Sequence, residues 1–266
     1  MDKHREKREN NRKLWDEITS VHFKHPEYGV EKFLNGENDL DKVILDEIGD
    51  VMAKRLLHLQ CHFGLDTLRF ARMGAEATGI DYSEEAIKHA RQLADLSKTK
   101  AKFIISDIYD CQSKCNEKFD IVFASFGVIC WLNDLNKWAE IIADFLQPGG
   151  YFYFVEGHPT SNIFNEEFQP VYKYFHEEEP EEWPPENDYC DWTYTPVNSS
   201  FEWNWTIGDV VTALCKAGLR LEFLHEFPFG AYKHFANMEK RENKQWWIPG
   251  KEYIIPLNFS LKAMKD

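Results

Sequence analysis

Short apolar runs alternate with amphipathic segments over much of the chain. The runs have the length and apolar content of buried strands, and they lie at residues 55–61, 75–81, 102–107, 119–127 and 151–157. The segments between them place apolar residues at intervals of three and four, which predicts helices. Strand and helix alternation of this kind indicates right-handed crossovers and a parallel sheet.

The alternation stops after the fifth run. Residues 157–205 are rich in Glu, Pro and aromatic residues, which in a compact domain is typical of a lid or binding loop. Thr206 then caps a helix that ends at Gly218, a strand follows, and residues 252–263 alternate as a further, antiparallel strand. We therefore expect an α/β fold: a doubly wound, mostly parallel sheet with an antiparallel last strand and an inserted lid.

The N-terminal part has a different pattern. Residues 1–20 are charged and predict an exposed helix with Leu14, Trp15 and Ile18 on one face, interpreted as a packing stripe. A break at His25-Pro26 precedes a short second segment. We expect residues 1–40 to form a helical cap segment and residues 41–266 to form the α/β domain, with the lid at 157–205.

Charge and composition narrow the function classes. The 266 residues carry a formal net charge of −14, which opposes binding to nucleic acid. No apolar run approaches the roughly 20 residues of a membrane span, and the first residues lack the apolar stretch of a secretion signal, so a cytoplasmic protein with six reduced cysteines is expected. Cys111 and Cys115 have no second Cys/His pair at zinc spacing, so no metal is expected. Both a monomer and a homodimer fit the sequence.

The segment from residue 56 to residue 90 carries the chemistry. A strand ends in a tight turn, a helix follows, and a second strand ends in Asp81. This order places backbone N–H groups and a carboxylate at the carboxyl edge of a parallel sheet, where an adenosine ligand fits. Asp81 has two acceptor oxygens, which suit the two ribose hydroxyls.

The turn, which reads LQCHFG, resembles motif I of the class I S-adenosylmethionine-dependent methyltransferases, and it is similar to a subset of bacterial methyltransferase-like proteins that carry LQCHFG. The order of elements follows that fold, a seven-stranded Rossmann-like sheet, over residues 55–156 and 206–262. The family usually has an acidic residue followed by glycines at alternate positions. In this chain His58 replaces the acid, Gln60 and His62 replace two glycines, and Gly64 remains.

The resemblance implies a set of residues that bind S-adenosylmethionine. Asp81 would hold the ribose, Asp107 the adenine amino group and Ser125 the methionine end. Tyr28 and Phe33 would close over the cofactor. Asp107 could instead be a helix cap, Tyr82 a surface aromatic residue, and Tyr28 and Phe33 packing residues. The full set is Gln60, Cys61, Gly64, Leu65, Asp81, Tyr82, Asp107, Ile108, Ser125 and Tyr28.

Methyl transfer is an in-line displacement, so the protein must mainly align the reacting groups and exclude water. An amine or hydroxyl acceptor needs one base. His158 is the first candidate, since the usual pKa of histidine suits neutral pH, although it could be a loop residue beside Pro159; Glu156 is the second. Candidates for binding the acceptor are Trp131, Tyr189 and Asp191.

The function expected is therefore methyl transfer from S-adenosylmethionine to a small molecule. The acidic run at residues 177–182 could attract a cationic acceptor or be a solvated loop. A non-catalytic binding module on the same fold stays open as an alternative. A nicotinamide-dependent reductase fits less well, because Gln60 and His62 crowd the approach of a pyrophosphate to the turn.

Overall fold

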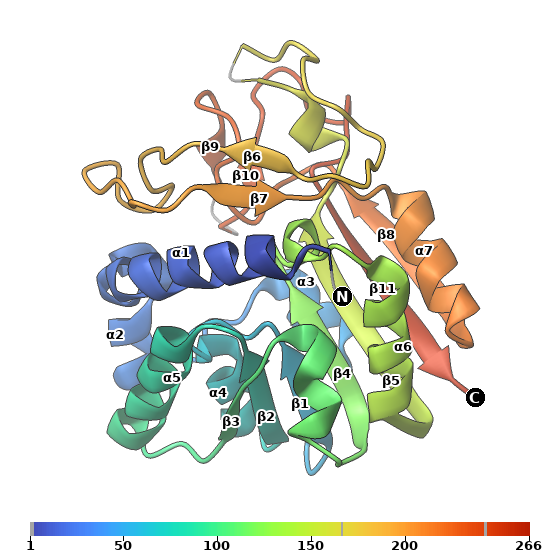
Figure 1. The fold of residues 1–266 in the computed structure, drawn as a ribbon. Coiled ribbons are helices and arrows are strands. Elements are labelled where there is room, and N and C mark those ends of the chain that lie inside the picture. Colours follow the sequence, from blue (N-terminus) through green and yellow to red (C-terminus); the bar gives the residue numbers. More distant parts are fainter. Residues whose placement is uncertain (1–2, 166, 242–243) are drawn as a thin grey trace.

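The computed structural model describes residues 3–165, 167–241 and 244–266. Its centre is a seven-stranded sheet in the order β3-β2-β1-β4-β5-β11-β8 (Figure 1). The first five strands in this order are parallel, and β11 is antiparallel to both of its neighbours. The prediction of a doubly wound, mostly parallel sheet with an antiparallel last strand is confirmed. The strands are β1 Arg55–Leu59, β2 Glu76–Asp81, β3 Lys102–Ile105, β4 Phe119–Ser125, β5 Leu146–Gly157, β8 Leu219–Phe227 and β11 Asn258–Lys265.

Helices cover both faces of the sheet, which explains why the central strands are almost continuously apolar. Phe152 and Phe154 of β5 face the cluster that contains α6 Leu135–Phe145 and α7 Ile207–Lys216. Tyr153 and Val155, pointing the other way, join the cluster built on α3 Lys42–Glu47 and α4 Leu65–Arg72. A third cluster joins α4 to α5 Glu84–Ser97 and to the short helix α2 Val30–Leu34.

The predicted helix cap at Thr206 is confirmed. Its side chain accepts from the Asp209 amide while Asp209 accepts from Thr206, which forms a capping box at the start of α7. Ser83 caps α5 by accepting from Ala86 N over 3.0 Å. None of the helices in the described ranges is long and apolar enough to cross a lipid bilayer.

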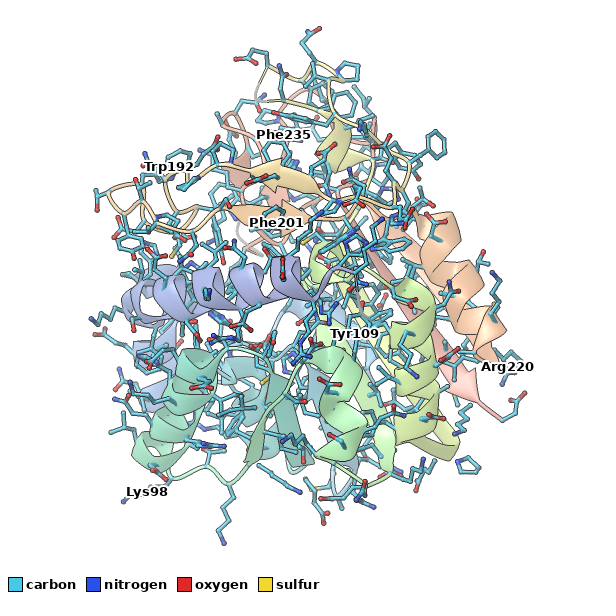
Figure 2. The ribbon with its side chains drawn as sticks, in the orientation of Figure 1. Lys98, Tyr109, Trp192, Phe201, Arg220 and Phe235 are labelled. Atoms are coloured by element: carbon cyan, nitrogen blue, oxygen red, sulfur yellow. The ribbon has the colours of Figure 1, made fainter. Side chains whose placement is uncertain are left out.

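Helix α1 Arg5–Lys24 lies across the top of the sheet in Figure 1, beneath the β6–β7 ribbon. The short helix η1 Pro26–Tyr28 and α2 follow it. The predicted helix is confirmed, and Leu14 and Ile18 of its apolar stripe are buried. The helix is less exposed than expected, because Arg8, Asn11 and His22 are buried as well. Figure 2 shows Phe201 above the α1 ribbon and Tyr109 below it, so α1 has neighbours on two sides.

Two irregular stretches form the upper part of the molecule in Figure 1. Residues 157–205 hold η4 Ser161–Ile163 and an antiparallel pair, β6 Glu181–Trp183 and β7 Ser200–Glu202. Residues 228–257 hold a second small pair, β9 Glu239–Lys240 and β10 Trp246–Trp247, which the alternation pattern does not reveal. The predicted terminal strand begins only at Asn258. The division into a cap segment, a domain and a lid stays a prediction.

Candidate cofactor and acceptor site

The topology changes direction between β1 and β4. From β1 the chain adds β2 and β3 on one side, and it then returns to add β4 and β5 on the other. In open α/β sheets ligands bind at such a point, outside the carboxyl ends of the strands. The turns after β1, β2, β3 and β4 carry most of the predicted cofactor-binding residues.

The turn after β1 has an unusual backbone. Gln60 and His62 have φ values of 52° although neither is glycine, a conformation that costs about 1–2 kcal/mol per residue. Gly64, with φ 69°, leaves no room for a side chain, because a Cβ atom would lie 2.4 Å from the Phe103 ring. The amides of Cys61 and Gly64 are both bonded, to Ile80 O and Cys61 O. Strained backbone that the surrounding structure holds in place is typical of functional sites.

Asp81 closes this turn from the end of β2. Its Oδ2 accepts from His62 N over 2.7 Å, and its Oδ1 accepts from Ser83 N over 2.8 Å. Burial raises the pKa of Asp81 to about 6 although the amides act in the opposite direction. Each carboxylate oxygen can accept a second hydrogen bond, so the side chain can still bind a pair of hydroxyl donors.

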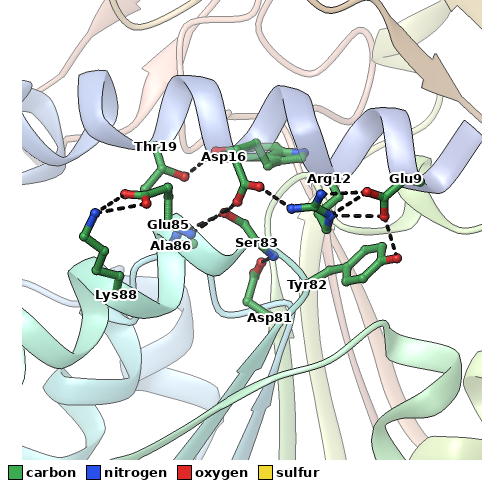
Figure 3. Close-up of polar contacts among 11 residues, drawn as sticks. Glu9, Arg12, Asp16, Thr19, Asp81, Tyr82, Ser83, Glu85, Ala86 and Lys88 are labelled. Atoms are coloured by element: carbon green, nitrogen blue, oxygen red, sulfur yellow. Dashed lines mark hydrogen bonds and ion pairs between the residues drawn. The ribbon is translucent and has the colours of Figure 1, made fainter.

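Helix α1 is fastened over this edge by polar contacts (Figure 3). Asp16 accepts from Ser83 Oγ over 2.6 Å and pairs with Arg12. Tyr82, directly after Asp81, donates through its hydroxyl to Glu9 over 2.9 Å. Tyr82 therefore contacts α1, and its predicted role in stacking on adenine stays a prediction.

Asp107 forms a second attachment for α1. As the cap of η2 Ile108–Ser113 it accepts from Tyr109 N, and its other oxygen pairs with Arg8 at 3.0 Å. Both charged side chains are 8% exposed. Arg8 also lies over the Tyr109 ring and donates to Asn133. Asp107 is therefore a helix cap, and it also forms a buried ion pair with Arg8. Ile108, next in the chain, is buried.

The loop after β4 joins the turn to β5. Gln60 Nε2 donates to Val128 O over 2.9 Å. The buried Glu156 accepts from the amides of Val128 and Gly157, each at 2.8 Å, and from that of Gly127. These bonds hold the loop between Ser125, the last residue of β4, and Trp131 in η3 Ile129–Trp131. A catalytic role for Glu156 stays a prediction.

The other two polar candidates have partners of their own. His158 Nε2 contacts Glu226 Oε1 at 2.8 Å, and its Nδ1 accepts from Thr160 N. Burial lowers the pKa of His158. Asp191 accepts from the amide and the hydroxyl of Thr193 in a tight turn. Neither residue is bonded to the turn after β1, so their catalytic and acceptor-binding roles also stay predictions.

Aromatic and histidine rings gather above the turn. Trp15 makes edge-to-face contacts with His62 at 5.2 Å and with Trp131 at 5.5 Å between ring centroids. Tyr28 lies 5.1 Å from Phe63 and also reaches His62. Its hydroxyl is bonded to that of Tyr189, one of the predicted acceptor-binding residues. Tyr28 is thus placed at the turn, whereas Phe33 packs in the core under Arg72.

The sequence interpretation missed His22, Asp188, Arg8 and Asp16. A signal for His22 was present, because it follows Trp15 and Ile18 at helical spacing on the stripe that was interpreted as packing. Asp188 gave no such signal, since it stands in an irregular segment without periodicity.

Two buried polar atoms are left over at this edge. Gln60 Oε1 and His62 Nε2 have no hydrogen-bond partner within the described ranges. Such orphans are uncommon and need an explanation. Together with the free acceptor capacity of Asp81, they fit a ligand with a hydroxyl pair at one end and polar donors at the other, which describes S-adenosylmethionine. In the described part of the chain no cluster of three or more His, Cys, Asp or Glu side chains could hold a metal.

Residues 56–150 match the family model for a methyltransferase domain. A ubiquinone biosynthesis O-methyltransferase from Bordetella avium is 26% identical over 118 residues, which cover 44% of this chain and 48% of that protein. A 23S rRNA uracil methyltransferase from Neisseria lactamica is 27% identical over 110 residues, 36% of this chain and 24% of its own. The chain thus spans about half, or less, of the length of these curated relatives.

Solved structures extend the similarity to most of the chain. An S-adenosylmethionine-dependent methyltransferase from Mesorhizobium loti superposes with a TM-score of 0.56 and 20% identity, over 86% of this chain and 99% of its own. At this identity the match establishes the fold. Residues 56–150 thus match a methyltransferase domain, and the chain has the fold of S-adenosylmethionine-dependent methyltransferases.

Proposed function

We propose that the protein transfers a methyl group from S-adenosylmethionine to a small-molecule acceptor by in-line displacement. The observation that carries the proposal is the polar set at the β1/β4 edge, in which Asp81 keeps free acceptor capacity beside the unpaired atoms of Gln60 and His62. The cofactor supplies an activated methyl group when bound. The protein must then bind the cofactor and the acceptor, orient their reacting groups and exclude water.

Each part of the edge has a task in this proposal. Asp81 binds the ribose hydroxyls, and the orphan oxygen of Gln60 accepts from the amino group of the methionine end. The loop that Glu156 holds positions Ser125 and Trp131 beside the reacting groups. Helix α1 and the lid cover the edge and keep water out.

Two observations support a small molecule over RNA as the acceptor, although one relative is named as an rRNA methyltransferase. A net charge of −14 repels a polyanion. The edge is also covered by α1, whereas a nucleic-acid strand needs a basic groove along which its backbone can lie. A cytoplasmic location is part of the same proposal.

The test has two arms. Calorimetry with S-adenosylhomocysteine measures cofactor binding, and formation of S-adenosylhomocysteine from S-adenosylmethionine is followed over a panel of phenols, amines, carboxylates and thiols. We expect binding to the unmodified protein and turnover with one class of acceptor. Asp81→Asn should bind at least tenfold more weakly. Binding without turnover on any acceptor would support the non-catalytic module, and no binding would overturn the proposal.

A further inference from the structure

Four side chains from two distant parts of the chain, residues 22–28 and 188–189, form an unbroken hydrogen-bonded series beside the candidate site. Asp188 Oδ2 lies 2.9 Å from His22 Nε2, and His22 Nδ1 lies 3.0 Å from the Tyr28 hydroxyl. That hydroxyl is bonded in turn to the hydroxyl of Tyr189. His22 and Asp188 have side chains only 0% and 3% exposed. None of these four residues lies in a strand of the seven-stranded sheet.

The chemistry of the groups fixes the direction of every bond. Asp188 is held as a carboxylate, because hydrogen bonds from His22 and from two backbone amides outweigh its burial and lower its pKa. A carboxylate only accepts, so the His22 Nε2 carries the proton and its Nδ1 accepts from Tyr28. Tyr189 then donates to the Tyr28 oxygen. Every donated proton therefore points along the series toward Asp188.

The outer end of the series opens where the turn after β1 meets the lid. The rings of His22 and Tyr28 lie 5.4 and 5.7 Å from the ring of His62, centroid to centroid. Tyr189, at the outer end, is 62% exposed. The His22–Asp188 end of the series is thus buried, and the Tyr189 end is accessible to a ligand. A proton relay requires this arrangement.

We propose that Asp188, His22 and Tyr28 form the base that takes the proton from the methyl acceptor, and that this acceptor is a phenol. The inference rests on the proposed function and adds the acceptor class to it. Tyr28 conducts the proton and does not store charge, because burial raises its pKa well above that of a free tyrosine. Asp188 orients the imidazole and stabilises its protonated form, as the acid of a catalytic triad does.

The proton balance is complete without a further reactant. The phenol oxygen forms its bond to the methyl carbon as the methyl–sulfur bond breaks. Its proton passes through the Tyr189 hydroxyl to the Tyr28 oxygen while the Tyr28 proton moves to His22 Nδ1. The imidazolium later loses this proton to solvent through the same series in reverse. A phenol, with a pKa of about 10, can give its proton to an imidazole in this way. The aromatic surroundings of the relay, Trp15, Tyr189 and Trp131, suit a flat ring.

His158 fits this role less well. Both of its ring nitrogens are used, one by the Thr160 amide and the other by Glu226. Glu226 is itself 53% exposed, so that pair is open to water. His22 is the histidine whose series of bonds ends in an accessible hydroxyl beside the turn.

The test compares two probes that differ in acidity, catechol and 4-nitrocatechol, with the unmodified protein, His22→Gln and Tyr28→Phe. We expect kcat with catechol to fall by about 100-fold or more in both variants, since general-base catalysis contributes about 10²- to 10⁴-fold. With 4-nitrocatechol, which ionises readily without help, the fall should be under about tenfold. His25→Gln, three residues from His22 and outside the relay, should behave as the unmodified protein. Thermal unfolding of each variant checks that it folds.

A second readout does not depend on turnover. When 4-nitrocatechol binds to the protein loaded with S-adenosylhomocysteine, its absorbance reports whether it is ionised. We expect the ionised form with the unmodified protein and a larger neutral fraction with either variant. Equal losses of kcat on both probes would mean a structural role and would overturn the relay. Turnover of amines but not phenols in the acceptor panel would overturn the phenol assignment and leave the proposed function standing, whereas no binding of S-adenosylhomocysteine would overturn both.

Discussion

The backbone amide of His62 donates to the carboxylate of Asp81 over 2.7 Å, which ties the turn after β1 to the end of β2. The bond fixes a turn that has side chains at positions where a glycine-rich turn would have none. It also means that the carboxylate is preorganised before any ligand arrives.

The ionisation of Asp81 should control cofactor binding. Its pKa of about 6 means that roughly a tenth of the carboxylate is ionised at pH 5 and nearly all of it at pH 7.5. Because the ionised form is the better acceptor for hydroxyls, affinity for S-adenosylhomocysteine should rise about tenfold between these values. Asp81→Asn should remove the pH dependence. Calorimetry at several pH values measures this, and an unchanged profile in the variant would count against Asp81 as the ribose ligand.

The same group makes a prediction about stability without ligand. Since the pKa of Asp81 in the folded protein lies above its usual value of 3.8, the folded state binds the proton more tightly than the unfolded state does. The contribution of Asp81 to stability is thus present below about pH 4 and is lost as the pH rises to about 6. The fall in the free energy of unfolding over this window should be smaller in Asp81→Asn, as measured by urea unfolding.

Gly64→Ala should be strongly destabilising for two separable reasons. The residue has φ 69°, and its Cβ would lie 2.4 Å from Phe103. Gly218→Ala is the matched control, because Gly218 has φ 83° with no atom within 4 Å of the added Cβ. The control should cost about 1 kcal/mol from the backbone alone, and Gly64→Ala about 2 kcal/mol or more. Equal midpoints of urea unfolding for the two variants would mean that the Phe103 ring can move away from the added Cβ at little cost in free energy.

Arg8→Met should loosen α1. It leaves Asp107 buried without its ion-pair partner, for which we expect a loss of about 3 kcal/mol in the free energy of unfolding. Arg5→Met, on the first turn of the same helix, is the control and should change stability little. Adding Asp107→Leu to Arg8→Met should recover part of the loss, because the uncompensated charge is then gone. No recovery in the double variant would show that Arg8 acts mainly through Asn133 and Tyr109.

The sheet could be predicted from the sequence because each of its signals is local. Each of these signals depends on residues that are near neighbours in the sequence: the apolar runs of β1, β4 and β5, the cap at Thr206, and the turn after β1. Helix α1 was located for the same reason. Its burial was not predicted, because the groups that bury Arg8 and His22 come from residues 107 and 188, far away in the chain.

The candidate site divides in the same way. Gln60, Gly64 and Asp81 could be proposed from the sequence because a motif in a single βαβ unit contains them. The relay of His22, Tyr28 and Asp188 was not found, since its members come from α1, η1 and the irregular lid. A lone aspartate in a segment rich in acidic residues carries no sequence signal of its own.

Glu156→Gln and His158→Gln separate positioning from proton transfer at the end of β5. The Glu156 carboxylate accepts from three backbone amides. In the glutamine variant the side-chain NH₂ group, which can only donate, would face backbone N–H groups that also donate. We expect this variant to lose about 1–3 kcal/mol of stability and to bind the acceptor more weakly, because the loop that carries Trp131 is released. His158→Gln should keep kcat within about threefold if His22 is the base. The contrary result would be a loss of kcat near 100-fold in His158→Gln, together with a kcat on catechol in His22→Gln equal to that of the unmodified protein. This result would assign the base to the end of β5 and not to the lid relay.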